Sequence, residues 1–367
     1  MEEARATILR QRLQTGFLGI IAFAILLFMM VQARFMLISL AIAIILFSLT
    51  TDAINAIARQ GVARWLATTL AFTLIAALLI GISTSIVAQV NAVVQIAVSY
   101  TERAQAALPD LTEWLGVGMQ DSLLSAIRGI NIAGWMRTMA GQAGDLLSGS
   151  ILIILFVGFM FAERMFFQTK LERLTGDPVQ ARQVGKIIST IMHKVNRYLV
   201  VKTAVSAVTG FAIWGVFKMA GLDLAMPIAI LTFVFNFIPS VGSIVATVIA
   251  FLLAFVLSGD IALALIVGAA CTGLQFVIGN ILDPMLLGQT LRLSSFGIII
   301  SLAFWGSLWG IPGMFLAVPI MVALMIICAH IDWLRPLAIL LSREGLPEET
   351  ANDTPPQADA DQPRQPT

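Results

Sequence analysis

Charged residues are scarce in this sequence, and their scarcity excludes most soluble classes. Asp, Glu, Lys and Arg make up 12% of its 367 residues, against about 25% in an average soluble domain. Apolar residues make up 59%, against about 45–50%. The formal net charge is +1 and no basic stripe interleaves with aromatics, so nothing predicts a nucleic-acid partner. The composition predicts a membrane protein whose first partner is the lipid bilayer.

Histidine and cysteine are almost absent as well. His193 and His330 are too few and too far apart for a metal site, and the zinc-protease pattern HExxH does not occur. Cys271 and Cys328 lie inside apolar segments, where a free thiol behaves as a small hydrophobe. The GxxxxGK[ST] phosphate loop of ATP-driven engines is missing too. We therefore expect no enzyme, no metal and no cofactor, with H⁺ or Na⁺ as a coupling ion at most.

Long apolar blocks dominate what is present. They recur from Phe17 almost to Trp333, separated by short polar connections, so a single signal-like segment cannot explain them. We predict an all-α polytopic membrane protein with about six full crossings and two re-entrant helical hairpins of opposite orientation. The alternative is a chain of about eight to ten ordinary spans.

Basic residues indicate the orientation, because Lys and Arg flanking a span stay on the cytoplasmic side. Residues 163–202 hold eight Lys or Arg against three acidic residues. Arginines also precede the first apolar block and follow the second. These patterns predict that both termini lie in the cytoplasm.

Composition divides the chain into five segments. Residues 1–90 should form membrane helices, and residues 91–147 an extracytoplasmic amphipathic helical region that covers the membrane, a neighbouring subunit or its own domain. Residues 148–197 should hold a membrane helix and a basic cytoplasmic linker. Residues 198–340 should form an inverted-repeat transport core, and residues 341–367, acidic and rich in Pro, a disordered cytoplasmic tail.

The stretch NFIPSVGS, residues 236–243, interrupts an apolar run that carries no charge. The arms on either side, residues 224–238 and 243–257, would each make only about 22 Å of helix against roughly 30 Å of hydrocarbon. Polar and turn-forming groups suit a tip buried in protein at membrane depth, because they can satisfy broken helix ends. These tip residues are Asn236, Pro239, Ser240, Gly242 and Ser243.

A second uncharged tip, WGIPGM, joins residues 296–310 to residues 314–328 and contributes Gly310, Pro312 and Gly313. Crossings predicted at 198–219 and 261–279 precede the two hairpins, so the second would enter the membrane from the opposite side. Broken helices of inverted repeats form solute and ion sites in secondary transporters. The alternative is that both pairs are ordinary spans kinked at proline.

Asp283 follows an apolar crossing and precedes Pro284, where a carboxylate could bind a cation, carry a proton or cap the next helical turn. Gln275 and Asn280 add polar groups in the same crossing, but they are five residues apart, a spacing that does not place both on one helix face. Lys202 and Lys218 lie near opposite ends of their crossing and are expected to snorkel to its surfaces.

The segments NFIPSVGSIVATVIAFLLA, GNILDPMLLGQTLRL and SLAFWGSLWGIPGMFLAVPI together resemble the autoinducer-2 exporter-like, or PerM-like, family of bacterial inner-membrane permeases. In layout the resemblance runs from about Gln11 to Arg343. It implies export of small molecules, with a furanosyl-borate precursor as the eponymous signal, while some relatives are similar to cation/proton antiporters. It also implies a homo-oligomer, with a pentamer as the suggested number.

Residues and resemblance together predict a secondary transporter, driven by an ion gradient, that exports a small solute such as an autoinducer-2-like signal. The alternatives are a cation/proton antiporter and a passive oligomeric channel with the uncharged tips as its constriction.

Overall fold

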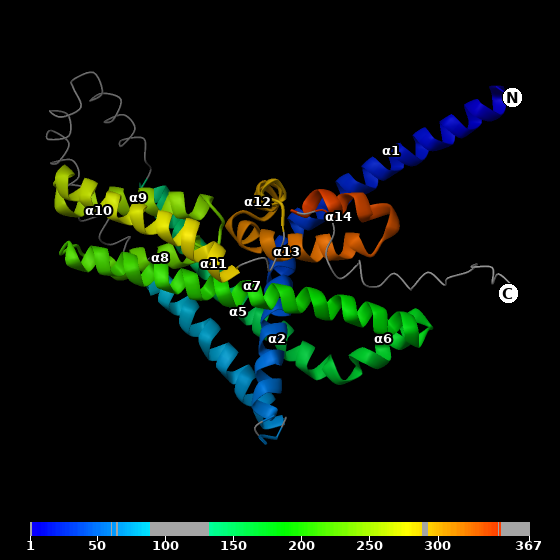
Figure 1. Ribbon diagram of the computed structural model, residues 1–367, viewed down its shortest axis with the longest axis horizontal. Coiled ribbons are helices and arrows are strands. Elements are labelled where there is room, and N and C mark those ends of the chain that lie inside the picture. The colour runs from blue at the N-terminus through cyan, green and yellow to red at the C-terminus, as the bar shows by residue number, and fades with distance from the viewer. Residues whose placement is uncertain are drawn as a thin grey trace, which may run out of the picture.

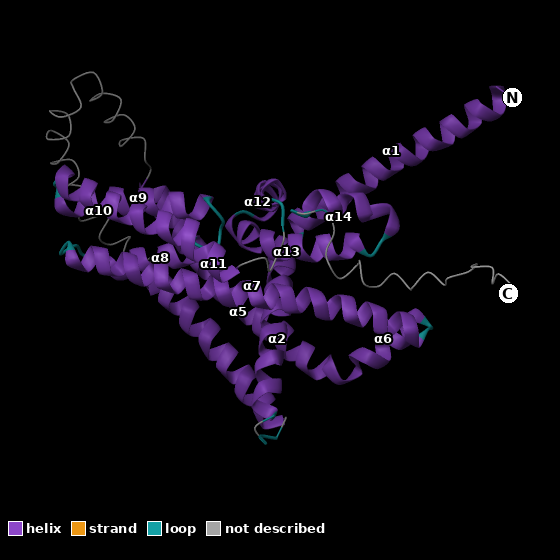
Figure 2. Ribbon diagram, in the orientation of Figure 1, coloured by secondary structure: helices purple, strands orange, loops and turns teal. Residues whose placement is uncertain are grey.

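The computed structural model describes residues 2–59, 61–63, 65–88, 132–287, 293–343 and 345. Throughout these ranges the regular structure is helical (Figure 2), apart from one isolated bridge between Leu293 and Ser342. Among the described residues, eight helices are long and apolar enough to cross a membrane. The prediction of an all-α polytopic membrane protein is confirmed.

The N-terminal helices form an angled frame (Figure 1). Helix α1 (Glu2–Gln32) and helix α2 (Arg34–Ala58) are separated only by Ala33, whose N–H donates to Met29 and whose carbonyl accepts from Leu37. Helix α2 packs against α5 (Ile132–Glu163), and the helix Trp65–Ala88 joins them. A buried 2.7 Å hydrogen bond between the hydroxyls of Ser83 and Ser150 ties that helix to α5.

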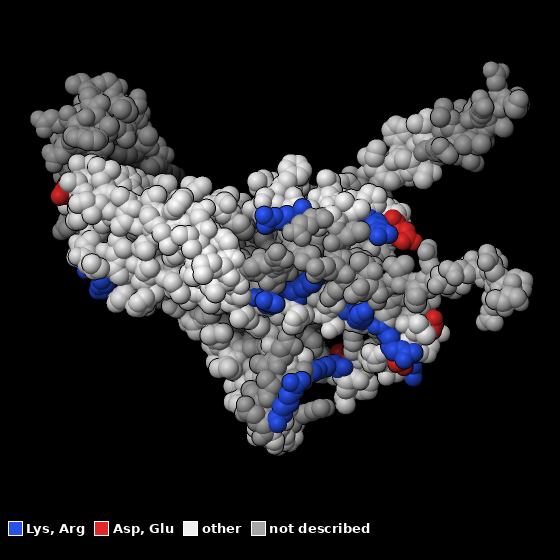
Figure 3. All heavy atoms as spheres, viewed as in Figure 1, with Lys and Arg blue, Asp and Glu red and all other residues white. Residues whose placement is uncertain are grey.

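The basic segment that follows is itself helical. After the short turn η2 (Arg164–Phe166), α6 (Phe167–Thr175) ends at Gly176, and Asp177 caps the start of α7 (Pro178–Met219) by accepting from Val179 N. Helix α7 therefore begins well before the predicted crossing at 198, and its 42 residues make about 63 Å of unbroken helix. Lys and Arg gather around α6 and the neighbouring part of α7, whereas the face over α8 to α10 is almost uncharged (Figure 3).

The next helices lie beside the C-terminal half of α7. Helix α8 (Ala225–Phe235) packs along α7, and α9 (Val241–Ser258) packs along α10 (Ile261–Val277). Helix α10 passes into the π-helical turn η3 (Ile278–Leu282) and then into α11 (Asp283–Leu287). The shared core includes Phe217 and Cys271, both fully buried.

The C-terminal part is a second hairpin with a short closing segment. Helix α12 (Ser295–Trp309) packs along α13 (Ile311–Ala329), followed by η4 (Asp332–Leu334) and α14 (Arg335–Leu341). The Leu341 carbonyl accepts a hydrogen bond from Ser294 N at 2.8 Å, so α14 is fixed to the start of α12.

The helix lengths single out the two predicted hairpins. Six of the eight candidate spans correspond to the six predicted crossings, and the other two are α9 and α13, the second arms of the hairpins. The first arms, α8 and α12, have 11 and 15 residues and are too short to cross about 30 Å of hydrocarbon. The second arms, with 18 and 19 residues, are longer than the predicted arms of about fifteen residues.

The second arms are longer because each helix begins inside its tip. Ser240 and Gly310, directly before α9 and α13, have positive φ angles of 60° and 67°, which reverse the chain within a few residues. Gly242 and Gly313 then lie against the preceding arm, where an added Cβ would overlap the carbonyl oxygens of Phe235 and Trp305 respectively. The two tips thus share the same construction.

Two predicted segments extend beyond the described residues. Of the expected extracytoplasmic region 91–147, residues 91–131 lie outside the described ranges and residues 132–147 begin α5. Of the expected tail, residues 346–367 lie outside them, whereas Leu341 belongs to α14 and Ser342 pairs with Leu293.

Replacing Gly242 or Gly313 by alanine should destabilise the protein by about 3 kcal/mol or more, because backbone cannot move aside as a side chain can. Gly215→Ala, near the C-terminal end of α7 with open space around it, is the matched control and should keep or raise stability. Thermal unfolding in detergent measures both. Equal melting of all three variants would contradict this account of the tips.

Candidate functional site

A buried polar stripe runs along one face of α7. Tyr198, Lys202, Ser206 and Thr209 follow one another at intervals of four, four and three residues, which places them on the same side of the helix. Tyr198 and Lys202 are 4% exposed, and Ser206 and Thr209 are fully buried. The stripe faces the protein interior in an otherwise apolar crossing.

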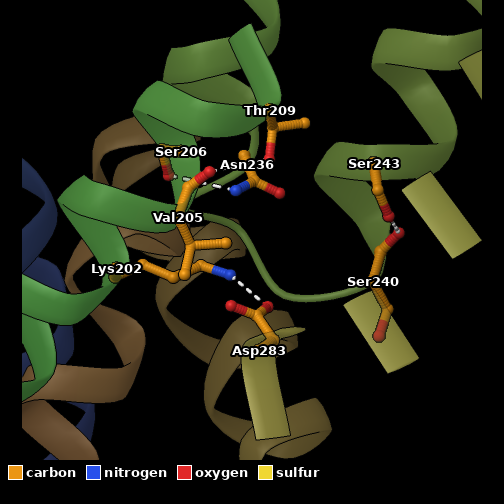
Figure 4. A network of polar contacts seen from close by, with 8 residues as sticks. All are labelled: Lys202, Val205, Ser206, Thr209, Asn236, Ser240, Ser243 and Asp283. Atoms are coloured by element: carbon orange, nitrogen blue, oxygen red, sulfur yellow. Dashed lines mark hydrogen bonds and ion pairs between the residues drawn. The ribbon is translucent and has the colours of Figure 1, made fainter. Parts of the chain in front are cut away.

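Lys202 forms an ion pair with Asp283, across 81 positions of sequence (Figure 4). Its Nζ lies 2.7 Å from Asp283 Oδ2, and the two side chains are 5% and 19% exposed. The expectation that Lys202 snorkels is therefore wrong: it turns inward because a carboxylate offers a partner that lipid does not. Lys218, in the last turn of α7, is exposed.

The local backbone brings Asp283 to α7. The π-helical turn η3 widens the helix, and Asp283 N–H donates to the Ile278 carbonyl five residues back. Pro284 has no N–H to continue the regular ladder. Asp283 caps no helical turn, because Oδ2 bonds Lys202 and Oδ1 has no hydrogen-bond partner. π-Helical turns are common at functional sites.

The first hairpin tip is bonded to the same stripe. Asn236 is buried, and its Nδ2 donates to Ser206 Oγ at 3.1 Å (Figure 4). Ser206 lies one helical turn from Lys202, so the ion pair and the tip are held by adjacent turns of α7. Thr209 Oγ1 donates to the Val205 carbonyl within the helix.

The two hairpin tips meet. The ring of Phe237, in the first tip, lies 4.7 Å from that of Phe315 on α13. Ile238 packs in the cluster of Trp305 and Trp309 from the second hairpin. Trp309 Nε1 also donates to the Met30 carbonyl at 3.1 Å, which fixes the second tip to the end of α1. Two stretches that sequence analysis identified separately are thus in contact.

The remaining predicted residues of the first tip have mixed positions. Ser240 is exposed and its carbonyl accepts from Ser243 Oγ at 2.9 Å, as Figure 4 shows. Pro239 is half-buried, and Gly242 is buried against the preceding arm.

The other predicted residues are not gathered around the ion pair as ligands. Gln275 is half-buried on α10, and Asn280 is exposed, with its Nδ2 donating to the Phe276 carbonyl of its own helix. The exposed members of the set are Pro284, Gly310 and Pro312, whereas Gly313 is buried. Within the described ranges no group of three or more His, Cys, Asp or Glu side chains could hold a metal ion.

Sequence reasoning missed the stripe itself. Lys202 was considered alone, and its neighbours Tyr198, Ser206 and Thr209 were not singled out. Their helical spacing in an apolar crossing was the available signal, since polar side chains recurring on one face of a membrane helix point to a protein neighbour or a cavity.

Known transport proteins are similar to this chain over much of its length. A sequence profile described as AI-2E family transporter matches residues 18–333. The AI-2 transport protein TqsA of Escherichia coli (strain K12) is 31% identical over 237 residues, 64% of this chain and 68% of that protein. A Borreliella burgdorferi protein provisionally named as a transport protein is 31% identical over 222 residues, 59% of this chain and 61% of that relative. A similarly named Haemophilus influenzae protein is 28% identical over 302 residues, 79% of this chain and 84% of that relative.

Breaking the ion pair from one side should cost about 3–5 kcal/mol of stability, because it leaves a buried charge without its partner. We expect Lys202→Met and Asp283→Asn each to lower the melting temperature in detergent, and the double variant to recover most of the loss. Lys218→Met, an exposed lysine on the same helix, is the control and should melt like the native protein. Losses that simply add in the double variant would contradict a direct pairing.

Proposed function

Because the chain belongs to the AI-2E family of transporters, we propose that it is a secondary transporter of the bacterial inner membrane, in which the Lys202–Asp283 pair couples an ion to the movement of a small solute. The buried ion pair carries this proposal. Ionisable side chains are rare within membrane segments and mark ion or proton pathways when they occur there. A purely structural contact would be served as well by apolar residues, since replacing a buried ion pair by them is often neutral or stabilising.

The pair is suited to ion exchange because the Asp283 carboxylate is bonded to Lys202, with which an incoming ion would compete. A proton or a Na⁺ ion that takes the carboxylate would release Lys202, and Lys202 would reclaim it when the ion leaves. The Ser206–Asn236 hydrogen bond lies one turn along α7, so displacement of the helix at Lys202 reaches the first tip directly. Contact between the tips through Phe237 and Phe315 would then be the element that opens and closes.

The solute is proposed from the relatives. A related protein is named for AI-2 transport, so a small signalling molecule of that kind, exported from the cell, is our proposed cargo. The hairpins would enter from opposite sides, with both termini in the cytoplasm and the protein working as a homo-oligomer. Cation/proton antiport is a second candidate, because an exchangeable Lys–Asp pair could serve it without an organic solute.

Asp283→Asn should abolish ion-coupled flux in proteoliposomes, because an amide cannot exchange a proton or hold the charge of Lys202. The assay follows AI-2, Na⁺ or K⁺ added under an imposed pH gradient, with an internal pH-sensitive dye. Asp260→Asn is the matched control, because Asp260 caps the start of α10 and asparagine caps equally well. We expect it to retain flux.

Undiminished coupled flux in Asp283→Asn would refute the role of the pair. Flux that reaches channel rates and does not depend on the imposed pH gradient would favour a passive pore.

Cysteines at two exposed positions, Ser240 in the first tip and Ser307 in the last turn of α12 before the second tip, test the opposed hairpins. In a background with both native cysteines replaced by alanine, membrane-impermeant maleimides should reach Ser240→Cys from outside the cell and Ser307→Cys from inside. Gly313 is unsuitable because a side chain would overlap Trp305. Labelling of both positions from one side would contradict the inverted arrangement.

A further inference from the structure

Tyr198 presents a buried hydroxyl that its surroundings do not explain. The residue is 4% exposed and packs among Leu199, Phe237, Val322 and Met325. Its hydroxyl has no hydrogen-bond partner in the described structure. Leaving a buried polar group unpaired costs free energy, and phenylalanine would fill the same space without that cost.

A second unpaired polar atom belongs to the ion pair itself. Asp283 Oδ1 is buried and has no hydrogen-bond partner, while Oδ2 bonds Lys202. Tyr198 lies one turn before Lys202 on the same buried face of α7. A phenol can donate and a carboxylate oxygen can only accept, so the two groups are complementary.

Few other titratable groups face this site. In the described parts of α7, η3 and α11, Lys202 pairs with Asp283, and Tyr198 lies one turn from Lys202 on the same face of α7. Cys271 on α10 belongs to a separate core cluster with Phe217, and α13, which packs against α7, carries no charged residue.

We propose that Tyr198 is a positioning residue of the ion site, whose hydroxyl donates to Asp283 Oδ1 when Lys202 moves away from the carboxylate. This inference rests on the function proposed above. When the bound ion leaves before Lys202 returns, the carboxylate would otherwise be charged, buried and unbonded, which is costly. A hydrogen bond to the charged form stabilises that form and lets the site release its proton. Tyr198 also belongs to the same apolar cluster as Phe237 of the first tip.

The test is the pH profile of coupled flux in Tyr198→Phe. Without the hydroxyl the carboxylate should keep its proton to higher pH, so the profile should move by about one pH unit to the alkaline side, the shift expected for loss of one charge-assisted hydrogen bond. A merely structural role would change the maximal flux and leave the midpoint unmoved. Leu199→Met, in the same apolar cluster, is the control and should leave the midpoint in place.

Fluorotyrosine provides a second arm that preserves the packing. In a Tyr100→Phe background Tyr198 is the single tyrosine, and 3-fluorotyrosine, a stronger hydrogen-bond donor, should shift the profile to the acid side. Opposite shifts for the two replacements support the proposal, whereas an unmoved midpoint in either overturns it.

Failure of the proposed coupling role of the ion pair can be distinguished from failure of the proposed role of Tyr198. Coupled flux that survives Asp283→Asn overturns both proposals, whereas loss of flux in Asp283→Asn with an unmoved Tyr198→Phe profile overturns only the role of Tyr198.

Discussion

The buried ion pair between Lys202 and Asp283 is the constraint on which the arrangement of the core depends. Two charges packed among apolar helices are tolerable only when each is the other's partner, so α7 and α11 have to lie side by side at this point. The π-helical turn before Asp283 and the polar stripe of α7 follow from that requirement, since one aims the carboxylate and the other supplies the face that receives it. The first tip then joins the same face through Asn236 and Ser206.

Around this polar centre the contacts are apolar and aromatic. Phe237 and Phe315 bring the tips together, and Ile238 packs with the two tryptophans of the second hairpin. Such contacts are not directional and can be broken and remade with little loss of specificity, whereas the polar contacts allow few arrangements. This core combines a specific polar centre with apolar contacts that can shift, a combination that suits a protein that changes conformation around a small ligand.

The sequence allowed the helical class, the crossings and both tips to be predicted, because long apolar runs and uncharged Pro and Gly tips are local signals. Asp283 could be singled out for the same reason. The partner of Asp283 could not, because it lies 81 positions away and a lysine near the end of a span usually reaches water. The sequence did not reveal that α7 is continuous, because its first half is rich in Lys and Arg and only its second half is apolar. The lengths of α9 and α13 depended on backbone angles at Ser240 and Gly310, which composition does not reveal.

The unbroken length of α7 has a mechanical consequence. Lys202 lies 24 residues from its start at Pro178, so about 36 Å of rigid rod precede the ion pair, more than the hydrocarbon is thick. The hairpin with α6 sits at the far end of that rod. Because the rod is rigid, a small tilt applied at the α6 end of α7 also displaces the helix at the ion pair between Lys202 and Asp283.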